Sequence, residues 1–434
     1  MSVIPPNSVS VPGAASPSCL RSSRAQDLLL GTLPLLFAAN LFLWSVFFPE
    51  ARQGHADFRQ LYVAGYMVRT GQSHQLYDYG VQHQLEDELV SREKLSLPFN
   101  HLAYEALLFV PLSLLSYRWA YPASNLVNLT LLLISYRLLL PYLVNLRQRW
   151  RWFPLCLFLA FLPGQIALMQ GQDSILLLLI LAAAYVLLSK ERDLAAGVVA
   201  GLGLFKFQLV LPLAAIYLLR RQWKFCVGFA GSAIVAATVS AALVGVEQMT
   251  HYVRSLGSMS IGLTSSADQF RYGIFPGHMA NLRGLVYGLA AGRWPNAYLQ
   301  IETLALSAII FGLVLLSLRK EVHPAALALP AIAMAVLVSY HVLTHDLTVL
   351  LIPLLLTLER APSADSGARK LLVWSAVALY LAPLCLLITP HHFYLVALPA
   401  GLFLAALVRH MNATDLNELR TAGLHSHPTS PLLE

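Results

Sequence analysis

Long runs of apolar residues, separated by short polar segments, dominate the chain. The first run, Leu28 to Phe48, is about 21 residues long, enough for a helix to cross a hydrocarbon core of about 30 Å. Further runs lie near residues 119–140, 152–169, 173–189, 194–205, 207–219, 225–245, 297–318, 323–340, 346–358, 371–389 and 393–409. Several are shorter than about 20 residues, so we expect tilted, broken or half-length helices that a larger bundle shields. The pattern predicts an all-α, polytopic membrane protein.

The start of the chain is typical of a polar tail followed by an uncleaved membrane anchor. Residues 1–26 are rich in Ser, Pro and Ala and carry Arg21 and Arg24. A cleaved signal peptide has an apolar region of roughly 7–15 residues that ends at a small-residue site. The first run here is longer, and Pro49-Glu50-Ala51-Arg52 follows it. We predict a disordered cytoplasmic tail over 1–26, a membrane domain over 27–410 and a second cytoplasmic tail over 411–434.

The segment 102–116 decides the topology, because Glu105 and Pro111 interrupt its apolar character. If this segment lies flat on the membrane and the other runs cross it, every short basic cluster falls on the cytoplasmic side, as the positive-inside rule requires. The clusters are Arg147, Arg149 and Arg151; Lys190 and Arg192; Arg220, Arg221 and Lys224; Arg319 and Lys320; Arg360, Arg369 and Lys370; and Arg409. We therefore expect about 12 spans and two long outer segments, near 49–118 and 246–296.

Composition argues against the soluble classes. Of the 434 residues, 57% are hydrophobic and 12% are charged, whereas a soluble domain is roughly 45–50% apolar and about 25% charged. A soluble enzyme, a disordered chain and a nucleic-acid-binding domain are poorly supported. The formal charge of +7 is best explained by the cytoplasmic clusters, and the four cysteines show no CxxC spacing for a metal or redox pair.

Acidic residues of the first outer segment are candidates for acid–base chemistry. Asp57 follows the first span by nine residues, where a carboxylate can accept a proton from an attacking sugar hydroxyl; the alternative is a solvated loop residue. Asp78 is a secondary candidate in a turn. Glu86-Asp87-Glu88 offers oxygen ligands for a divalent cation, but a solvated helix face explains it better. Without an Asp-x-Asp or a His/Cys cluster, we predict no obligatory metal and no cofactor.

Lys206 stands alone between two short apolar runs. A charge at membrane level is costly and is a functional candidate by default, here for neutralising a phosphate leaving group. The alternative is a lysine that snorkels to the outer headgroups. Gln172 belongs to a Gly-rich outer turn with Gln165, Gln170 and Asp173, where amides either bind sugar hydroxyls or cap helix ends.

Later outer segments add further candidates for binding a phosphate. Arg283, in Asn281-Leu282-Arg283-Gly284, suits a bidentate phosphate clamp, with lipid-headgroup contact as the alternative. His341 and His345-Asp346 lie in one outer turn. Two histidines and one aspartate are weak support for zinc, and a histidine oriented by a carboxylate toward a phosphate is the preferred interpretation.

These residues resemble glycosyltransferase family 87, the polytopic transferases that use polyprenyl-phosphate sugars. The resemblance covers roughly residues 28–410. It rests on Asp57-Phe58 with Tyr62 and Ala64, Gly71, Leu76-Tyr77-Asp78, Phe99-Asn100-His101, Glu105-Ala106-Leu107-Leu108-Phe109 and Pro111-Leu112, and then on Gly171-Gln172, Lys206, Asn281-Leu282-Arg283-Gly284 and His345-Asp346-Leu347. Leu102-Ala103 stands where such proteins often carry a Pro-Pro pair.

The resemblance implies a C-type glycosyltransferase (GT-C) fold and an inverting, metal-independent transfer on the outer face. It implies Asp57 as general base and Lys206 and His345 near the donor phosphate. We therefore expect a bacterial inner-membrane transferase that moves a sugar from polyprenyl phosphate to a lipid or glycan hydroxyl. Mannose is the sugar we expect, and we expect no nucleic acid as a partner. The alternative functions are a transporter or flippase for a lipid-linked sugar, or a non-catalytic membrane scaffold.

Overall fold

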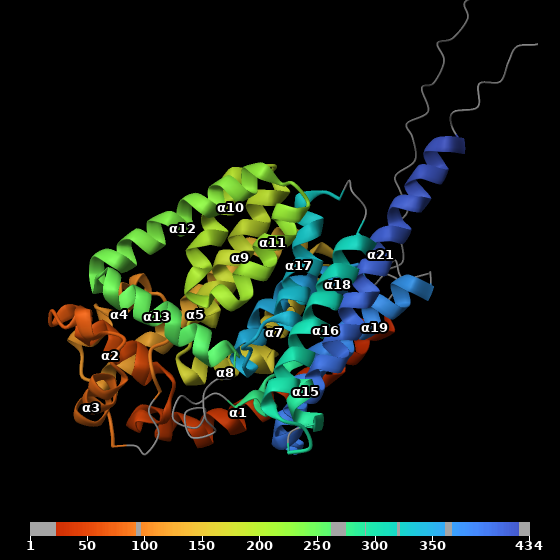
Figure 1. The fold of residues 1–434 in the computed structure, drawn as a ribbon. Helices are drawn as coiled ribbons and strands as arrows, with labels where there is room; N and C mark the ends of the chain where they lie inside the picture. The colour runs from red at the N-terminus through yellow and green to blue at the C-terminus, as the bar shows by residue number, and fades with distance from the viewer. Residues whose placement is uncertain are drawn as a thin grey trace, which may run out of the picture.

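Helices account for all the regular structure in the part of the chain that a computed structural model describes (Figure 1). The described residues are 23–92, 97–261, 275–290, 292–318, 322–360 and 367–424, without the side chains of 257–261 and 413–424. Most of the predicted tail over 1–26 lies outside these ranges, and helix α1 begins at Arg24. Helix α21 continues to Leu424, past the predicted start of the second tail.

Seven helices are long and apolar enough to cross a membrane, or eight if one bent pair is a single span, counting the described residues only. The bent pair is α7 with α8, which meet at 54°. The prediction of about 12 crossings stays a prediction. The bundle consists of α1 (Arg24–Glu50), α5 (Tyr117–Leu139), α7 (Phe153–Ala160), α8 (Leu162–Gln170), α9 (Ser174–Ser189), α10 (Asp193–Gly201), α11 (Phe207–Leu219), α12 (Trp223–Val244), α16 (Asn296–Ser317), α17 (Pro324–Val338), α18 (Leu351–Leu358), α19 (Gly367–Leu381), α20 (Cys385–Ile388) and α21 (Ala397–Leu424). Turns η5 (Leu140–Tyr142), η6 (Leu202–Lys206), η8 (Thr344–Leu350), η10 (Ala382–Leu384) and η11 (Pro390–Val396) and helix α6 (Val144–Arg149) connect them.

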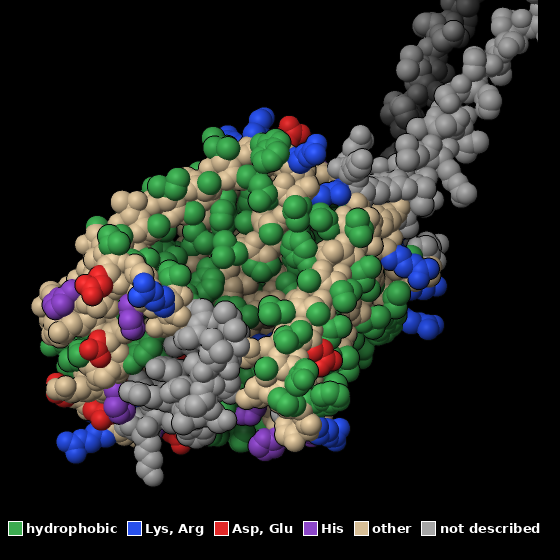
Figure 2. Space-filling model, viewed as in Figure 1, with side chains coloured by type: hydrophobic (Ala, Val, Ile, Leu, Met, Phe, Trp, Pro, Cys, Tyr) green, Lys and Arg blue, Asp and Glu red, His purple; other side chains and the backbone are tan. Residues whose placement is uncertain are grey.

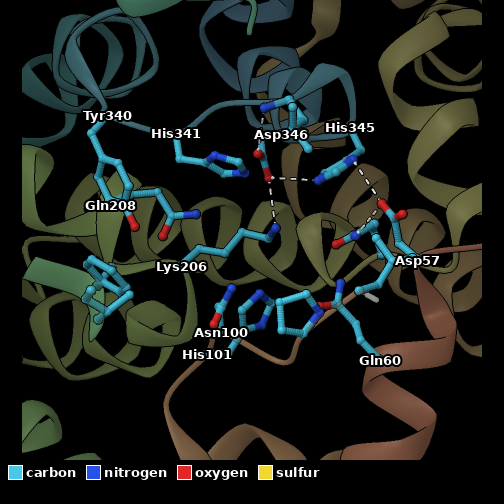
Figure 3. A pocket seen from close by; sticks show the side chains of 16 residues that line it. Asp57, Gln60, Asn100, His101, Lys206, Gln208, Tyr340, His341, His345 and Asp346 are labelled. Carbon is cyan, nitrogen blue, oxygen red and sulfur yellow. Dashed lines mark hydrogen bonds and ion pairs between the residues drawn. The ribbon is translucent and has the colours of Figure 1, made fainter. Parts of the chain in front are cut away.

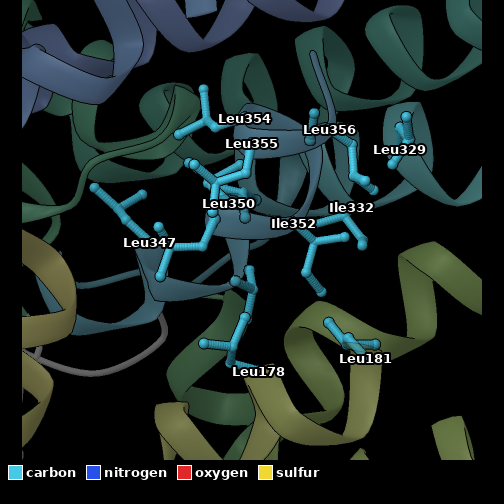
Figure 4. Packing of buried hydrophobic residues seen from close by; sticks show 14 of the residues in the cluster. Leu178, Leu181, Leu329, Ile332, Leu347, Leu350, Ile352, Leu354, Leu355 and Leu356 are labelled. Carbon is cyan, nitrogen blue, oxygen red and sulfur yellow. The ribbon is translucent and has the colours of Figure 1, made fainter. Parts of the chain in front are cut away.

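Short apolar helices occupy the centre of the bundle. Every residue of α18 is buried, as is every residue of α17 from Leu327 to Leu337, and Figure 4 shows Ile332 of α17 and Ile352 of α18 on the side that faces Leu178 and Leu181 of α9. A helix that is apolar on all sides is expected where other helices surround it. The peripheral helices differ, because α16 exposes large side chains such as Leu304 and Leu316. Lipid contact accounts for this exposure.

The segment Asp193–Leu219 has the length and hydropathy of one span, but it folds back at Lys206. Gly197 of α10 lies so close to α12 that an added Cβ would be 2.0 Å from the carbonyl oxygen of Phe225. The Tyr217 ring, near the end of α11, stacks on the same Phe225 at 4.1 Å between centroids. The two ends of the segment are therefore neighbours, as the prediction of two short runs separated by Lys206 requires.

The two segments predicted to lie outside build a cap on one end of the bundle. The first contains η1 (Ala51–His55), α2 (Phe58–Arg69), η2 (Ser73–Gln75), α3 (Tyr79–Leu89), η3 (Ala103–Glu105), α4 (Ala106–Phe109) and η4 (Leu112–Leu114), and the second contains α13 (Val246–Ile261), η7 (Pro276–His278) and α15 (Leu282–Ala290). The range 102–116 forms only turns of three or four residues and no spanning helix. Tyr77 and Tyr252, one from each segment, stack at 4.5 Å inside a separate hydrophobic core.

The basic clusters gather at the opposite end of the bundle. There the Gln26 amide donates to the Leu358 carbonyl (3.0 Å), Arg149 pairs with Asp27, and the Arg220 guanidinium donates to the Leu318 carbonyl (3.1 Å). Arg319 and Lys320 lie outside the described residues. These contacts join the chain near α1, α6, α11, α16 and α18, so the segments predicted to be cytoplasmic meet at one end.

The close packing of α10 on α12 leads to a stability prediction. A Cβ at Gly228 would lie 2.1 Å from the Leu194 carbonyl oxygen, whereas Gly231, on the same helix, has nothing within 4 Å. We expect Gly228→Ala to lower thermal stability in detergent by about 1–3 kcal/mol through overpacking. Gly231→Ala should be neutral or stabilising, because alanine favours the helix. Equal melting temperatures for the two variants would contradict the described helix contact.

Candidate active site

Polar side chains from the cap and the bundle gather in a pocket between them. The pocket has a cavity volume of about 130 Å³, and α2, the 97–101 loop, the Lys206 turn and the 340–346 turn border it. Its lining residues, ten of them labelled in Figure 3, are Asp57, Gln60, Leu97, Pro98, Asn100, His101, Gln172, Lys206, Phe207, Gln208, Leu256, Tyr340, His341, Leu343, His345 and Asp346. Of the predicted site residues, Asp57, His101, Gln172, Lys206, His341, His345 and Asp346 therefore meet here.

Asp57 is held by the turn that ends α8. The Gln172 amide donates to Asp57 Oδ2 (2.8 Å), and the backbone N–H of Asp57 donates to Gln170 Oε1 (3.0 Å). Gly171, between the two glutamines, has φ of +62°, and an added Cβ there would lie 2.7 Å from Cβ of Phe58. A side chain at Gly171 would be disfavoured twice, by backbone conformation and by contact. About a quarter of the Asp57 side chain is exposed, so its carboxylate is accessible from the pocket.

Lys206 lies between two buried carboxylates. Its ammonium is 2.8 Å from Asp173 Oδ1 and 2.9 Å from Asp346 Oδ1, and all three side chains are nearly inaccessible to solvent. Asp346 also accepts hydrogen bonds from the Ser174 hydroxyl (2.9 Å) and the Leu343 N–H (3.0 Å). Lys206 also lines the pocket, so the two ion pairs hold its ammonium at the edge of this space.

His345 lies between Asp57 and the lysine cluster (Figure 3). Its Nδ1 is 3.9 Å from Asp57 Oδ2, and its Nε2 is 3.6 Å from Asp346 Oδ1. Both distances exceed a normal hydrogen bond, so the imidazole is near both carboxylates without being fixed to either. The nearby His341 also lines the pocket, and burial lowers the pKa of His341 to about 4, which makes it neutral at pH 7.

His101 forms a second cationic group of the pocket. Its Nδ1 is 3.2 Å from Asp173 Oδ2 and also contacts Glu105. Burial alone would lower the pKa of His101, but the carboxylates of Glu105 and Asp173 raise it to about 10. When the imidazole is neutral, His101, Glu105 and Asp173 also offer three ligand atoms within 4.8 Å of one another, a set that can hold a metal ion. The Asp173 carboxylate also forms the ion pair with Lys206, so it contacts both positive groups.

Four predicted site residues do not line the pocket. The Asn281 amide donates to the Ser339 carbonyl and accepts from the Gly284 N–H, and Arg283 donates to the Tyr340 carbonyl (2.9 Å). Both thus support the backbone that carries Tyr340 and His341. The Tyr62 hydroxyl donates to the Leu115 carbonyl (2.8 Å) within the cap core, and exposed Asp78 caps the N-terminus of α3.

Asp173 and Glu105 are the site residues that sequence reasoning undervalued. Both were noted, Asp173 in the Gly-rich turn and Glu105 as an interruption of the flat segment, but neither was assigned to the site. The usable signal was an isolated carboxylate beside an apolar run, because a buried acid needs a cationic partner. Gln60, Gln208 and Tyr340 carry no comparable signal, since such residues are common in loops, whereas Asn100 belongs to the Phe99-Asn100-His101 motif of the resemblance.

The central lysine yields a prediction about stability. Lys206→Met leaves Asp173 and Asp346 as buried, uncompensated charges, which should cost about 3–5 kcal/mol. The variant should become more stable as pH falls, because the folded-state pKa of an unpaired buried carboxylate is raised and its protonated form is favoured. Adding Asp346→Asn should recover part of the loss. Thermal unfolding of the purified protein at several pH values measures all three effects, and a fully stable single variant would exclude the described ion pairs.

The pKa of His101 yields a separate pH prediction. Because this pKa lies above the ordinary value of about 6.5, the stabilisation from charged His101 is complete below pH 6.5 and is lost as pH rises toward 10. His101→Gln should therefore lower the melting temperature strongly at pH 6 and little near pH 10. His391→Gln, at an exposed position, is the matched control and should show no such trend. A loss for His101→Gln that is independent of pH would contradict the charged state.

Comparison with known protein families gives a match. The family model for glycosyltransferase family 87 matches residues 104–340, which is more than half of the chain. The matched range contains Asp173, Lys206 and Arg283, whereas Asp57, His101 and the 341–346 turn lie outside it. No curated protein and no solved structure matches the chain.

Proposed function

Since the chain belongs to glycosyltransferase family 87, we propose that it transfers a sugar from polyprenyl phosphate to a lipid or glycan hydroxyl at the outer membrane face, with Asp57 as general base. The observation that carries the proposal is the convergence of Asp57 with Lys206, His101, His345 and Asp346 on one pocket. The proposal includes the GT-C fold over 27–410, a bacterial inner-membrane location and mannose as the first sugar to test.

The proposed reaction is an in-line displacement at the anomeric carbon. The acceptor oxygen bonds to this carbon while its proton passes to the Asp57 carboxylate. The bond from the anomeric carbon to the phosphate oxygen breaks, and its electron pair leaves with polyprenyl phosphate. Attack opposite the leaving group inverts the anomeric configuration. Holding both substrates in this alignment supplies much of the acceleration, and the base contributes typically 10²–10⁴-fold.

The positive groups suit the phosphate that accumulates charge. Lys206 offers its ammonium, and His101, whose Nδ1 is directed at Asp173 and Glu105, offers its Nε2. Asp173 and Asp346 keep these cations fixed before substrate binds, so little reorganisation is needed when the bond breaks. His345 lies next to Asp57 and provides a polar contact between the base and the phosphate region.

Charge distribution supports the outer location. The site lies at the end of the bundle opposite the contacts of Gln26, Asp27, Arg149 and Arg220, and the positive-inside rule assigns basic ends to the cytoplasm. Figure 2 shows a hollow lined with hydrophobic side chains between α12 and α16. We propose that the polyprenyl chain lies in this hollow.

The transporter alternative predicts a different arrangement. Transporters of lipid-linked substrates place binding residues near the membrane midplane, often between inverted repeats. Here the ionisable side chains of the pocket lie at the junction of cap and bundle. This placement favours a transferase, whose acceptor approaches from outside, and a carboxylate next to bound cations suits proton transfer.

Replacing the proposed base tests the mechanism. Asp57→Asn preserves size and the acceptor atom for Gln172, so it should leave the fold intact and reduce sugar transfer by at least about 100-fold. The assay uses purified protein, labelled polyprenyl-phosphate mannose and other polyprenyl-phosphate sugars, and a native lipid extract.

Asp78→Asn is the matched control. It is the same substitution at an exposed position of the cap, away from the pocket. It should transfer sugar at nearly the wild-type rate. Near-wild-type turnover by Asp57→Asn would exclude Asp57 as the base.

A further inference from the structure

Helix α3 of the cap turns two polar side chains inward. The triplet Glu86-Asp87-Glu88 favours a solvated helix face, and Glu88 is exposed, but Glu86 is fully buried. Gln82, one helical turn earlier and on the same face, is buried as well. Buried polar groups need hydrogen-bond partners, and the partners of these two side chains connect α3 to the candidate active site.

The two side chains hold the backbone of the 97–101 loop. The Phe99 N–H donates to Gln82 Oε1 at 2.7 Å, and the Leu97 N–H donates to Glu86 Oε2 at 3.4 Å. Two N–H groups of one short loop are therefore fixed by one face of α3.

The end of the loop, at His101, is held through the same contacts. The Gln82 amide nitrogen donates to the Leu76 carbonyl, and the hydroxyl of the next residue, Tyr77, donates to the His101 carbonyl at 2.9 Å. The Phe99 ring lies 5.4 Å from the His101 ring, measured between centroids. Gln82 thus holds one residue that contacts His101 and the neighbour of another.

Glu86 joins α3 to the element that carries the proposed base. Its Oε2 is 3.4 Å from Nη2 of Arg59 on α2, and both side chains are buried. Arg59 also donates to the Ser91 carbonyl, just after α3, at 3.1 Å. Because Arg59 follows Asp57 by two residues, α3 contacts the start of α2 as well as the loop that ends at His101.

We propose that Gln82 and Glu86 are positioning residues, which set the place of His101 relative to Asp57 and so align the donor phosphate with the base. This inference rests on the proposed transferase function. Neither side chain lines the pocket, so each acts through its neighbours. A loop without these anchors has more conformations to lose when the phosphate binds, and this entropy cost lowers the affinity.

Hydrogen exchange tests the anchor without requiring turnover. Gln82→Met nearly keeps the side-chain volume but removes the acceptor for the Phe99 N–H, which becomes a buried donor without a partner. Exchange at the Phe99 amide, followed by mass spectrometry on the full-length protein in lipid nanodiscs, should be at least about tenfold faster. Gln84→Met is the same substitution at an exposed position of α3 and should leave this exchange unchanged.

Binding of polyprenyl phosphate, the proposed leaving group, tests the positioning role. His101→Gln removes a charged contact and should weaken binding at least about fivefold. Gln82→Met should weaken binding by a similar factor in the wild-type background. In the His101→Gln background it should weaken binding less than about twofold, because Gln82 acts through His101. A general loss of stability would weaken binding equally in both backgrounds.

Glu86 gives a second test if Gln82→Met folds poorly. Glu86→Gln keeps an acceptor for the Leu97 N–H but leaves Arg59 as an uncompensated buried charge, so polyprenyl phosphate should bind more weakly. Adding Arg59→Met removes that charge and should restore binding to within about twofold of wild type. Glu86→Met combined with Arg59→Met lacks the acceptor as well and should stay weak. Glu88→Gln, at an exposed position, is the matched control.

The outcomes separate this inference from the transferase proposal. Unchanged exchange at Phe99 in Gln82→Met, additive effects of Gln82→Met and His101→Gln, or no binding of polyprenyl phosphate by wild type would each overturn the inference. If wild type transfers no sugar while the two substitutions are coupled in binding, the transferase proposal fails and the positioning of His101 stands. Transfer by wild type with additive effects leaves the transferase standing without this role for α3.

Discussion

The contact of one buried ammonium with two buried carboxylates determines how the centre of this protein is arranged. Lys206 ends η6, Asp173 precedes α9, and Asp346 lies in the first turn of η8. Burying any of these charges alone costs free energy. The end of η6 and the starts of α9 and η8 must therefore lie next to one another. The shortness of α9 and α11 follows from this requirement. A helix that ran through the bundle at either position would carry its charge into the apolar core or away from its partners.

The candidate site combines the cluster of Lys206, Asp173 and Asp346 with residues of the cap. Asp57 comes from the start of α2 and His101 from the loop before η3, and both are held by residues at the 170–173 turn of the bundle. Because Gly171 has no side chain, this turn can approach Phe58 closely and form hydrogen bonds with Asp57. Asp57, the proposed base, and the cations proposed to bind the phosphate are therefore both tied to the α8–α9 turn. Such a rigid connection suits a displacement that requires two substrates in line.

Sequence reasoning identified the elements better than it identified the contacts. The apolar runs are helical, the 102–116 range forms no spanning helix, and Lys206 is at a turn, because these features depend on local hydropathy and on the cost of a lone charge. The partners of Lys206 were not foreseen, since Asp173 has the same residue type and position as an ordinary helix cap. Arg283 and Asn281 hold backbone carbonyls at Ser339 and Tyr340, and no one-dimensional pattern shows such partners. Tyr62 and Asp78 are of residue types common in binding sites. In the structure, Tyr62 packs in the cap core and Asp78 caps α3.

The order of the two carboxylates along the chain has a consequence for biogenesis. Synthesis proceeds from the N-terminus, so Asp173 is made before Lys206, and Asp346 follows much later. When the folded-back pair α10–α11 enters the membrane, Asp173 at the start of α9 is already present to neutralise the lysine. The first ion pair therefore forms between near neighbours in the nascent chain. The second ion pair closes only after α17 has inserted, and it locks the finished bundle around a charge that the first half of the protein has already accommodated.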